Sequence, residues 1–310
     1  MLSRIQKLFQ SQKNEVHDET GWIPRDCLVL PFRSKEEYDR FRQRDHLSQA
    51  SLWQYTHLIT RIAPDDQTFP GYCGLCDREV EFGFERNPDG SINFREQLQC
   101  SGCKQIARVR AVNLILLGLL PNPESVVFTT EQASLAYQWL RARYPAAIGS
   151  EYNRPGDRAQ FQKYIDILFD DNQKLRFEDV TRLSFEDQSL DAIISCDVLE
   201  HVPDYQRALR EFVRVLKPGQ FLILSVPFDE LRAENLLRAR LDDEGRVEHL
   251  VEPEYHGDPV SHKGVLAYHT FGWELLEAVR NAGFSDVFWC RSIQPQQAIF
   301  SGQWAVVARR

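Results

Sequence analysis

The chain has 310 residues, 43% hydrophobic and 26% charged, proportions typical of a globular protein with room for one large and one small domain. No apolar run reaches membrane-spanning length and no secretory signal opens the sequence, so we expect no membrane span and a cytoplasmic location. The formal net charge of −8 falls on residues 111–310, because basic and acidic side chains balance over residues 1–110. An acidic half attracts polyphosphates weakly, which disfavours a nucleic acid as the substrate.

The N-terminal third divides into two parts. Residues 1–66 are polar, with helical stretches around 35–44 and 48–62, and we expect them to form a helical or irregular cap. Residues 67–110 form the second part. Apolar and polar residues alternate over 80–84, an Asn-Pro-Asp-Gly turn follows, and the alternation then resumes. This pattern predicts a β-hairpin.

Four of the seven cysteines form two CxxC pairs, Cys73 with Cys76 and Cys100 with Cys103. Each CxxC turn presents two thiolates to one ion, and two such turns complete the tetrahedral site that Zn²⁺ prefers. A redox dithiol is the alternative, but such a motif opens a helix and does not come as a matched pair. The spacing therefore predicts a zinc ribbon over residues 67–110. Because all four ligands are cysteines, the zinc is expected to be structural.

From about residue 111 the pattern changes to alternating strands and helices. The expected strands cover residues 125–130, 147–152, 175–180, 190–195, 221–226, 285–290 and 304–308. The expected helices cover residues 131–143, 159–169, 205–216 and 270–282. Strands separated by helices predict a doubly wound α/β sheet over residues 111–310, with ligands at the carboxyl ends of the strands.

Residues 178–228, EDVTRLSFEDQSLDAIISCDVLEHVPDYQRALREFVRVLKPGQFLILSVPF, resemble the second half of a class I S-adenosylmethionine-dependent methyltransferase. The likeness extends over about 115–310. The zinc ribbon, residues 148–152 and residues 256–261 further resemble a subgroup of the type 11 methyltransferases that carries a ribbon. The resemblance implies a Rossmann-like seven-stranded sheet and S-adenosylmethionine as the cofactor.

The candidate cofactor residues lie where strands are expected to end. Glu151 follows the first strand by about 20 residues, where nucleotide-binding sheets place a carboxylate that accepts ribose hydroxyls. By resemblance, Asp179 and Val180 contact the adenine, and Cys196 and Asp197 lie near the methionine part. The full set comprises Thr129, Glu131, Glu151, Tyr152, Asp179, Val180, Cys196 and Asp197.

The loop after the first strand departs from the family pattern. Most members have a glycine-rich loop there, whereas residues 128–134, FTTEQAS, contain no glycine. Either hydroxyl groups and the following helix N-terminus replace that loop, or cofactor binding is weakened or lost.

The catalytic candidates are Glu200, His201, His256 and His262. The element Asp-x-x-Glu-His at residues 197–201 is similar to one that, with a distant histidine, binds a divalent metal in some O-methyltransferases and in an RNA 2′-O-methyltransferase. His256, His262 or His269 would be that partner, and a second metal would then be a cofactor. Alternatively, His201 only packs at a helix start, as it often does in the family, and His256 and His262 contact substrate.

Three functions remain open. The first is methyl transfer to a small or conjugated molecule, with oxygen as the favoured acceptor and a saccharide as one class that the resemblance suggests. The second is a non-catalytic protein that binds a partner through the same fold. The third is an RNA methyltransferase with the ribbon as reader, which the charge distribution disfavours. The sequence leaves the oligomeric state undetermined.

Overall fold

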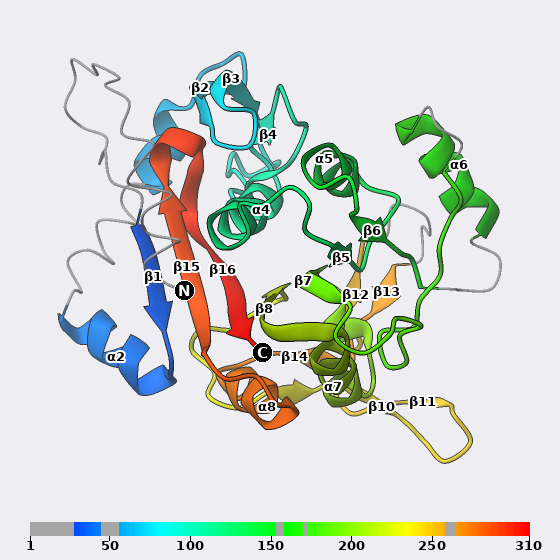
Figure 1. The fold of residues 1–310 in the computed structure, drawn as a ribbon. Coiled ribbons are helices and arrows are strands. Elements are labelled where there is room, and N and C mark those ends of the chain that lie inside the picture. Colours follow the sequence, from blue (N-terminus) through cyan, green and yellow to red (C-terminus); the bar gives the residue numbers. More distant parts are fainter. Residues whose placement is uncertain (1–27, 45–55, 153–157, 170–172, 258–263) are drawn as a thin grey trace. The chain divides into compact units, whose positions relative to one another are not determined.

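The computed structural model describes residues 28–44, 56–152, 158–169, 173–257 and 264–310. The chain divides into two compact units. Unit 1 comprises residues 1–121 and 289–305, and unit 2 comprises residues 122–288 and 306–310. The chain passes from one unit to the other inside two long strands, β15 (Val287–Gln294) and β16 (Ile299–Arg309) (Figure 1).

The main sheet has seven strands, the predicted number, but it includes a strand from the expected cap and lacks the expected strand over 175–180. Besides β15 and β16 it contains β1 (Leu28–Phe32), β5 (Val127–Thr129), β6 (Ile148–Gly149), β7 (Leu190–Cys196) and β8 (Leu216–Ser225). The strand order is β1-β15-β16-β8-β7-β5-β6. Strands β6, β5, β7 and β8 run parallel, whereas β16 is antiparallel to β8 and β1 is antiparallel to β15. The predicted α/β class is therefore confirmed, with a mixed sheet.

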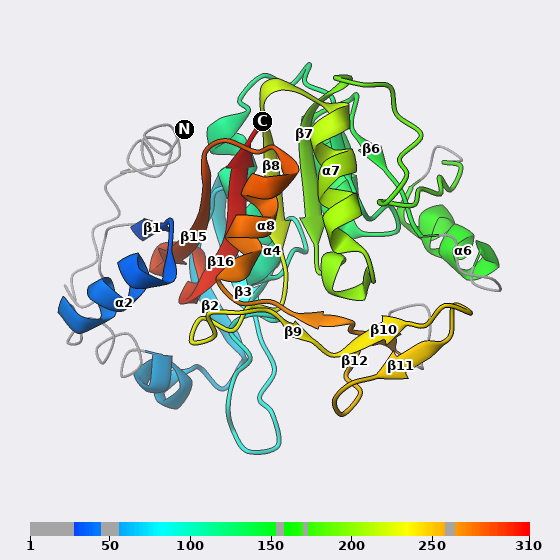
Figure 2. The same ribbon diagram turned by 90° about the horizontal axis from the view of Figure 1, so that it is seen from below.

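Two helices cover one face of the sheet in unit 2. They are α7 (Tyr205–Val215) and α8 (Glu274–Ala282), which lie side by side (Figure 2). Helix α7 buries one stripe of apolar residues and ends before Pro218 and Gly219, as its sequence predicts. Helix α8 ends at Gly283, whose φ of 117° is the left-handed conformation that glycine adopts without steric cost.

The remaining helices of unit 2 begin close to their expected positions. They are α5 (Leu135–Arg143) and α6 (Arg158–Leu168). In contrast, residues 175–180 form no strand and pair only through single bridges, which include Glu151 with Phe177. Between β8 and α8 lies an insertion of short strands that the sequence did not predict (Figure 2). These strands are β9 (Leu236–Leu237), β10 (Ala239–Leu241), β11 (Val247–His249), β12 (Tyr255–His256), β13 (Val265–Leu266) and β14 (His269–Thr270).

Unit 1 contains a three-stranded sheet in the order β2-β3-β4. The strands are β2 (Thr68–Cys73), β3 (Arg78–Gly83) and β4 (Gln99–Cys100). The predicted hairpin between the two CxxC pairs is confirmed in part: β3 pairs antiparallel with β4, and Arg86 bridges Ile92 across the predicted turn, although residues 92–94 form no strand. The pairing of β2 with β3, with the first CxxC in the turn between them, was not predicted. Helix α2 (Lys35–Arg44) matches its predicted span, and α4 (Ala107–Leu119) follows the second CxxC. Of the predicted helix over 48–62, residues 56–62 are helical and the rest lies outside the described residues.

The helices of the described residues are all too short or too polar to cross a membrane.

Candidate functional site

The carboxyl ends of the parallel strands in unit 2 meet at one edge of the sheet, which we call the cofactor edge. Strands β7, β5 and β6 are neighbours, and Phe177 continues the row through its parallel bridge to Glu151. The backbone of Glu151 both donates to the Arg176 carbonyl, at 2.9 Å, and accepts from Glu178, at 3.1 Å. The predicted cofactor residues therefore follow four adjacent strand positions, where open α/β sheets bind their ligands.

The loop without glycine is held in place by side chains. Glu151 Oε1 accepts hydrogen bonds from the backbone N–H groups of Gln132, at 2.8 Å, and Ala133, at 2.7 Å. The buried Gln132 side chain donates to the Lys174 carbonyl and accepts from the Arg176 N–H, at 3.0 and 2.7 Å. These hydrogen bonds connect the loop to Glu151 and to residues 174–176. Gln132 makes the bonds to residues 174–176, and nothing in the sequence singles it out.

Gly149, in the strand beside the loop, allows the loop backbone to lie very close to the end of β6. A Cβ added to Gly149, at the end of β6, would lie 2.9 Å from the Glu131 carbonyl oxygen and 3.0 Å from Gln132 Cα. Both contacts are with backbone, so neither can be relieved by rotating a side chain. Gly149 therefore lets the backbone of the loop pack directly against the end of β6.

The substitution Gly149→Ala is expected to weaken S-adenosylhomocysteine binding about tenfold, because displacing the 131–132 backbone costs about 1–3 kcal/mol, the usual range for overpacking. Isothermal calorimetry measures the change. Gly83→Ala is the matched control, since its added Cβ meets only one atom, at an ordinary 3.9 Å. Equal affinity of Gly149→Ala and wild type would show that the loop position does not matter for binding.

The hydroxyl groups near the loop are engaged within the protein. The Thr130 hydroxyl donates to Ser195 Oγ at 3.2 Å, and the Ser134 hydroxyl caps α5 by accepting from the Tyr137 N–H. Of the other predicted cofactor residues, Thr129 is buried at the end of β5 and Tyr152 is 60% exposed beyond β6. The sequence hypothesis that hydroxyls replace the glycine loop is therefore incomplete, because Gln132 and Glu151 hold this loop.

Asp179 and Asp197 occupy tight turns at the cofactor edge. Asp179 is exposed and its Oδ1 accepts from both the N–H and the hydroxyl of Thr181, while Val180 beside it is buried. Asp197 has a φ of 51°, an uncommon conformation that Asp tolerates better than most residues. Its backbone N–H donates to the Ser225 carbonyl at 2.7 Å, and the Ser225 hydroxyl donates to Asp197 Oδ1 at 3.2 Å. These bonds set the direction of the chain after Cys196.

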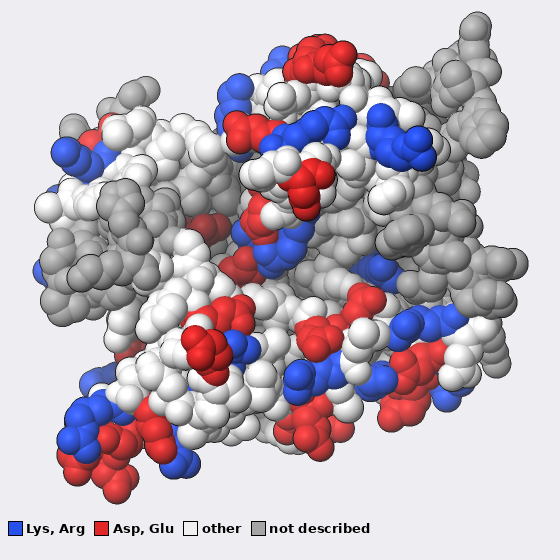
Figure 3. Space-filling view, turned by 180° about the vertical axis from the view of Figure 1, so that it is seen from behind, with Lys and Arg blue, Asp and Glu red and all other residues white. Residues whose placement is uncertain are grey.

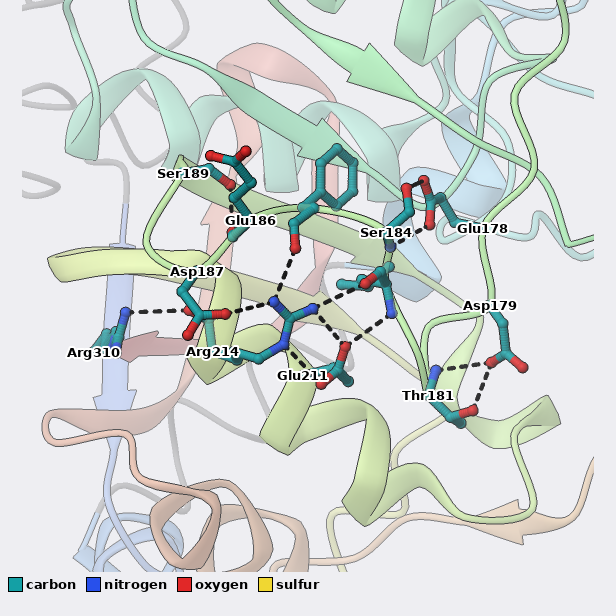
Figure 4. Close-up of polar contacts among 12 residues, drawn as sticks. Glu178, Asp179, Thr181, Ser184, Glu186, Asp187, Ser189, Glu211, Arg214 and Arg310 are labelled. Carbon is teal, nitrogen blue, oxygen red and sulfur yellow. Dashed lines mark hydrogen bonds and ion pairs between the residues drawn. The ribbon is translucent and has the colours of Figure 1, made fainter.

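Arg214 on α7 fastens the segment that follows Asp179 (Figure 4). Its Nε and one terminal nitrogen donate to the two carboxylate oxygens of Glu211, at 2.9 and 2.8 Å. The remaining N–H groups donate to the carbonyls of Leu183 and Phe185 and to Asp187, at 2.7–2.9 Å. All five guanidinium N–H groups are therefore used, which a lysine cannot reproduce.

The substitution Arg214→Lys is expected to lower the free energy of unfolding by about 2 kcal/mol at pH 7, because several charge-assisted hydrogen bonds are lost. The Arg214 side chain lowers the pKa of Glu211, so this stabilisation is present above the ordinary glutamate pKa and disappears as the pH falls through the folded value. The difference between variant and wild type should therefore narrow below about pH 4. Denaturant unfolding measures it, with the exposed Arg210→Lys on the same helix as control. A pH-independent difference would contradict this account.

Glu200 lies in a short 3₁₀ turn, η1 (Leu199–His201), directly after the cofactor edge. Its side chain is fully buried, and His256 Nδ1 and His201 Nε2 lie 3.5 and 3.8 Å from its Oε1. The two imidazole rings are 5.0 Å apart in an edge-to-face arrangement. The Glu200 carboxylate, followed by Glu254, raises the pKa of His256, and burial opposes this. Three of the four predicted catalytic residues are thus brought together.

The other histidines differ. His262 lies outside the described residues. His269 is buried, its Nε2 faces the Pro203 carbonyl at 3.2 Å, and burial lowers its pKa. It packs against Tyr205 and Phe271, so its surroundings are those of a core residue. Tyr268, which the sequence reasoning missed, donates its backbone N–H to the Glu200 carbonyl at 2.7 Å, and burial raises the pKa of its phenol.

In unit 1 the four predicted zinc ligands converge. The sulfurs of Cys73, Cys76, Cys100 and Cys103 all lie within 4.8 Å of one another. Cys76 Sγ is 3.7 Å from Cys100 Sγ, and Cys73 Sγ is 4.0 Å from Cys103 Sγ. A tetrahedron with metal–sulfur bonds of about 2.3 Å has edges of about 3.8 Å, so both of these separations are close to those of a zinc site.

The two CxxC turns have matching backbones. Asp77 and Lys104, the residues that follow them, both have a left-handed conformation, with φ of 53° and 59°. A Cβ added to Gly102 would meet Cys76 Sγ at 2.7 Å, so only glycine lets the second turn approach the first. Arg110 is fully buried with its guanidinium 4.2 Å from the Phe82 ring. Burial lowers the pKa of Arg110, and its attraction to the four cysteine thiolates opposes this.

The parallel strands, their cofactor edge and the helices covering the sheet define a Rossmann-like α/β fold. Residues 138–224 match the family described as methyltransferase domain. That segment begins inside α5 and covers β6, α6, β7, α7 and nearly all of β8, whereas β5 and the loop after it lie outside the matched residues. The resemblance to S-adenosylmethionine-dependent methyltransferases that the sequence suggests is therefore confirmed over this segment.

Several solved structures are similar to this chain at low identity. A 1,6-didemethyltoxoflavin N1-methyltransferase from Burkholderia thailandensis, with S-adenosylhomocysteine bound, is 20% identical over 66% of this chain and 78% of its own, with a TM-score of 0.42. A methyltransferase from Mesorhizobium loti is 17% identical over 67% and 100%, with a TM-score of 0.43. A complex of the Trm112 methyltransferase activator with a putative methyltransferase from Haloferax volcanii is 16% identical over 66% of this chain and 88% of its own, with a TM-score of 0.42.

Proposed function

We propose that this protein transfers the methyl group of S-adenosylmethionine to a hydroxyl oxygen of a small or conjugated molecule, such as a saccharide. The observation that supports the cofactor most directly is Glu151, which anchors the loop from the end of β6, where related sheets bind ribose. The exposed turn at Asp179 lies along the same edge and suits a nucleoside.

The residues of the chain would divide the task. Glu151 and Tyr152 would hold the ribose, Asp179 and Val180 the adenine, and Cys196 and Asp197 the methionine part. Thr129 and Glu131 would line the loop. S-adenosylmethionine supplies an electrophilic methyl group on a sulfonium sulfur. Because Glu200 and His201 follow shortly after Asp197 and His256 lies beside Glu200, the three residues are placed to orient the acceptor or take its proton. His262 stays a catalytic prediction.

We further propose that Cys73, Cys76, Cys100 and Cys103 bind one structural zinc ion. With four thiolates the zinc site carries two negative charges, and the buried Arg110 would offset part of that charge. Thiolates of this kind persist in a reducing compartment, which agrees with the proposed cytoplasmic location.

A nucleic-acid substrate is disfavoured by the surface charge. On the face that Figure 3 shows, Lys and Arg side chains of the described residues are interspersed with Asp and Glu side chains. Binding a phosphate backbone calls for a broad basic tract. A non-catalytic role remains the second candidate, since a loop without glycine is the feature expected of a chain that has lost its cofactor.

Calorimetric titration of the purified protein with S-adenosylmethionine and S-adenosylhomocysteine tests the proposal. Micromolar binding that the variant Asp179→Ala weakens would support the enzyme, and transfer of labelled methyl to a panel of saccharides and phenols would then identify the acceptor. If folded protein binds neither compound, the proposed activity is wrong and the partner-binding role gains support.

A further inference from the structure

The Glu200 carboxylate is buried in an unusual state. Both of its oxygens are inaccessible to water and accept no hydrogen bond from the described residues. A buried carboxylate without donors is costly, by several kcal/mol in general. The polar atoms that face it are His256 Nδ1, 3.5 Å from Oε1, and His201 Nε2, 3.8 Å from the same oxygen. Both separations are too long for a strong hydrogen bond.

The outer partners of the two histidines fix where their protons lie. His201 Nδ1 is 2.8 Å from the Leu266 carbonyl oxygen, which can only accept, so Nδ1 carries the proton. His256 Nε2 is 3.1 Å from the Glu254 carboxylate, which favours a proton on Nε2. The lone pairs of His201 Nε2 and His256 Nδ1 then both point toward Glu200. Metal-binding histidines are oriented by outer acceptors in this manner.

We propose that Glu200, His201 and His256 bind a divalent first-row transition metal ion. The three donor atoms lie within 4.8 Å of one another. Metal bonds of about 2.0–2.2 Å place neighbouring donors about 3.0–3.5 Å apart, so small side-chain rotations complete the site. Two imidazoles with one carboxylate favour ions such as Zn²⁺, Fe²⁺, Co²⁺ or Mn²⁺ over Ca²⁺ and Mg²⁺. The competing explanation is a proton shared between His256 and Glu200.

Three protein ligands leave open positions on the ion, and this part of the inference rests on the proposed function. An acceptor hydroxyl bound there would lose its proton to water more readily. Its oxygen would then form a bond to the methyl carbon while the carbon–sulfur bond breaks and the electron pair stays on sulfur. The ion would therefore select acceptors with an accessible hydroxyl group.

Titration with Mn²⁺ of protein that holds only one zinc ion per chain, followed by electron paramagnetic resonance of the free ion, tests the site. Mn²⁺ is the weakest binder of its series and should not displace zinc from four thiolates. We expect one Mn²⁺ per chain in addition to the zinc. Glu200→Gln and the half-exposed His256→Ala should each weaken Mn²⁺ binding at least tenfold, whereas the exposed control Glu252→Gln should leave it unchanged.

Titration of each variant with S-adenosylhomocysteine reports whether the fold and the cofactor edge are intact. Absence of Mn²⁺ binding by the wild-type protein would overturn the metal site. So would Mn²⁺ binding by both site variants that is as tight as that of wild type. Cofactor binding without Mn²⁺ binding would refute the ion and leave the proposed function standing. Mn²⁺ binding that depends on Glu200, without cofactor binding, would support the metal site and refute the proposed function.

Discussion

The variant Cys76→Ser is expected to lose its zinc and to lower the free energy of unfolding of unit 1 by more than about 4 kcal/mol. Structural zinc contributes about 10–16 kcal/mol of binding free energy in small modules, and losing one of four thiolates removes a large share of it. The second CxxC depends most on the metal, because β4 has two residues and pairs with β3 at only two positions. Zinc content after chelator washing and thermal unfolding measure the two effects.

Cys290→Ala is the matched control for this variant. Cys290 is fully buried in β15 and lies outside the sulfur cluster, so its replacement should lower stability through packing alone and keep one zinc per chain. Wild-type protein that stays folded after chelation with much less than one zinc per chain would refute the structural role. The four cysteines would then have to be explained by redox chemistry.

The parts of the fold that repeat a simple period could be predicted from the sequence. The apolar stripe of α7 and the continuous apolar run of β8 lie in the structure where their patterns place them. The expected strand over 175–180 failed for a specific reason. Side chains take its backbone donors: Gln132 accepts from the Arg176 N–H at 2.7 Å and Gln162 from the Leu175 N–H at 3.3 Å. Such long-range side-chain bonds leave no periodic signal.

The part of the candidate site that is local in sequence could be predicted, whereas the part that depends on long-range pairing could not. Glu200 and His201 are neighbours in sequence at a strand end, so their proximity to the cofactor edge follows from the strand order. The approach of His256 depends instead on the pairing of β12 with β13, two strands of two residues each within an unpredicted insertion. Gly149 did offer a signal, because a glycine in a strand often marks a close backbone approach. It had been assigned only to the strand.

Replacement of Glu151 is expected to have the largest effect on the cofactor. Glu151→Ala should raise the dissociation constant for S-adenosylhomocysteine about 100-fold, because it removes two functions at once. The carboxylate anchors the loop through the N–H groups of Gln132 and Ala133, and by our proposal it also accepts the ribose hydroxyls. Hydrogen bonds to a charged group are worth about 1.5–3 kcal/mol each, and about 2.7 kcal/mol is 100-fold.

Glu151→Gln separates the two functions of this carboxylate. Its single amide oxygen can still accept from both loop N–H groups, but its NH₂ group replaces the second carboxylate oxygen as a partner for the ribose. We therefore expect Glu151→Gln to lose about tenfold in affinity for S-adenosylhomocysteine, a smaller loss than that of Glu151→Ala, while the exposed control Glu124→Gln binds normally.

If the Gln and Ala variants lose affinity equally, the negative charge and not the loop is decisive. If both bind within threefold of wild type, the cofactor does not occupy this edge of the sheet. Calorimetry of the three variants distinguishes these outcomes, and it does so before any methyl acceptor is known.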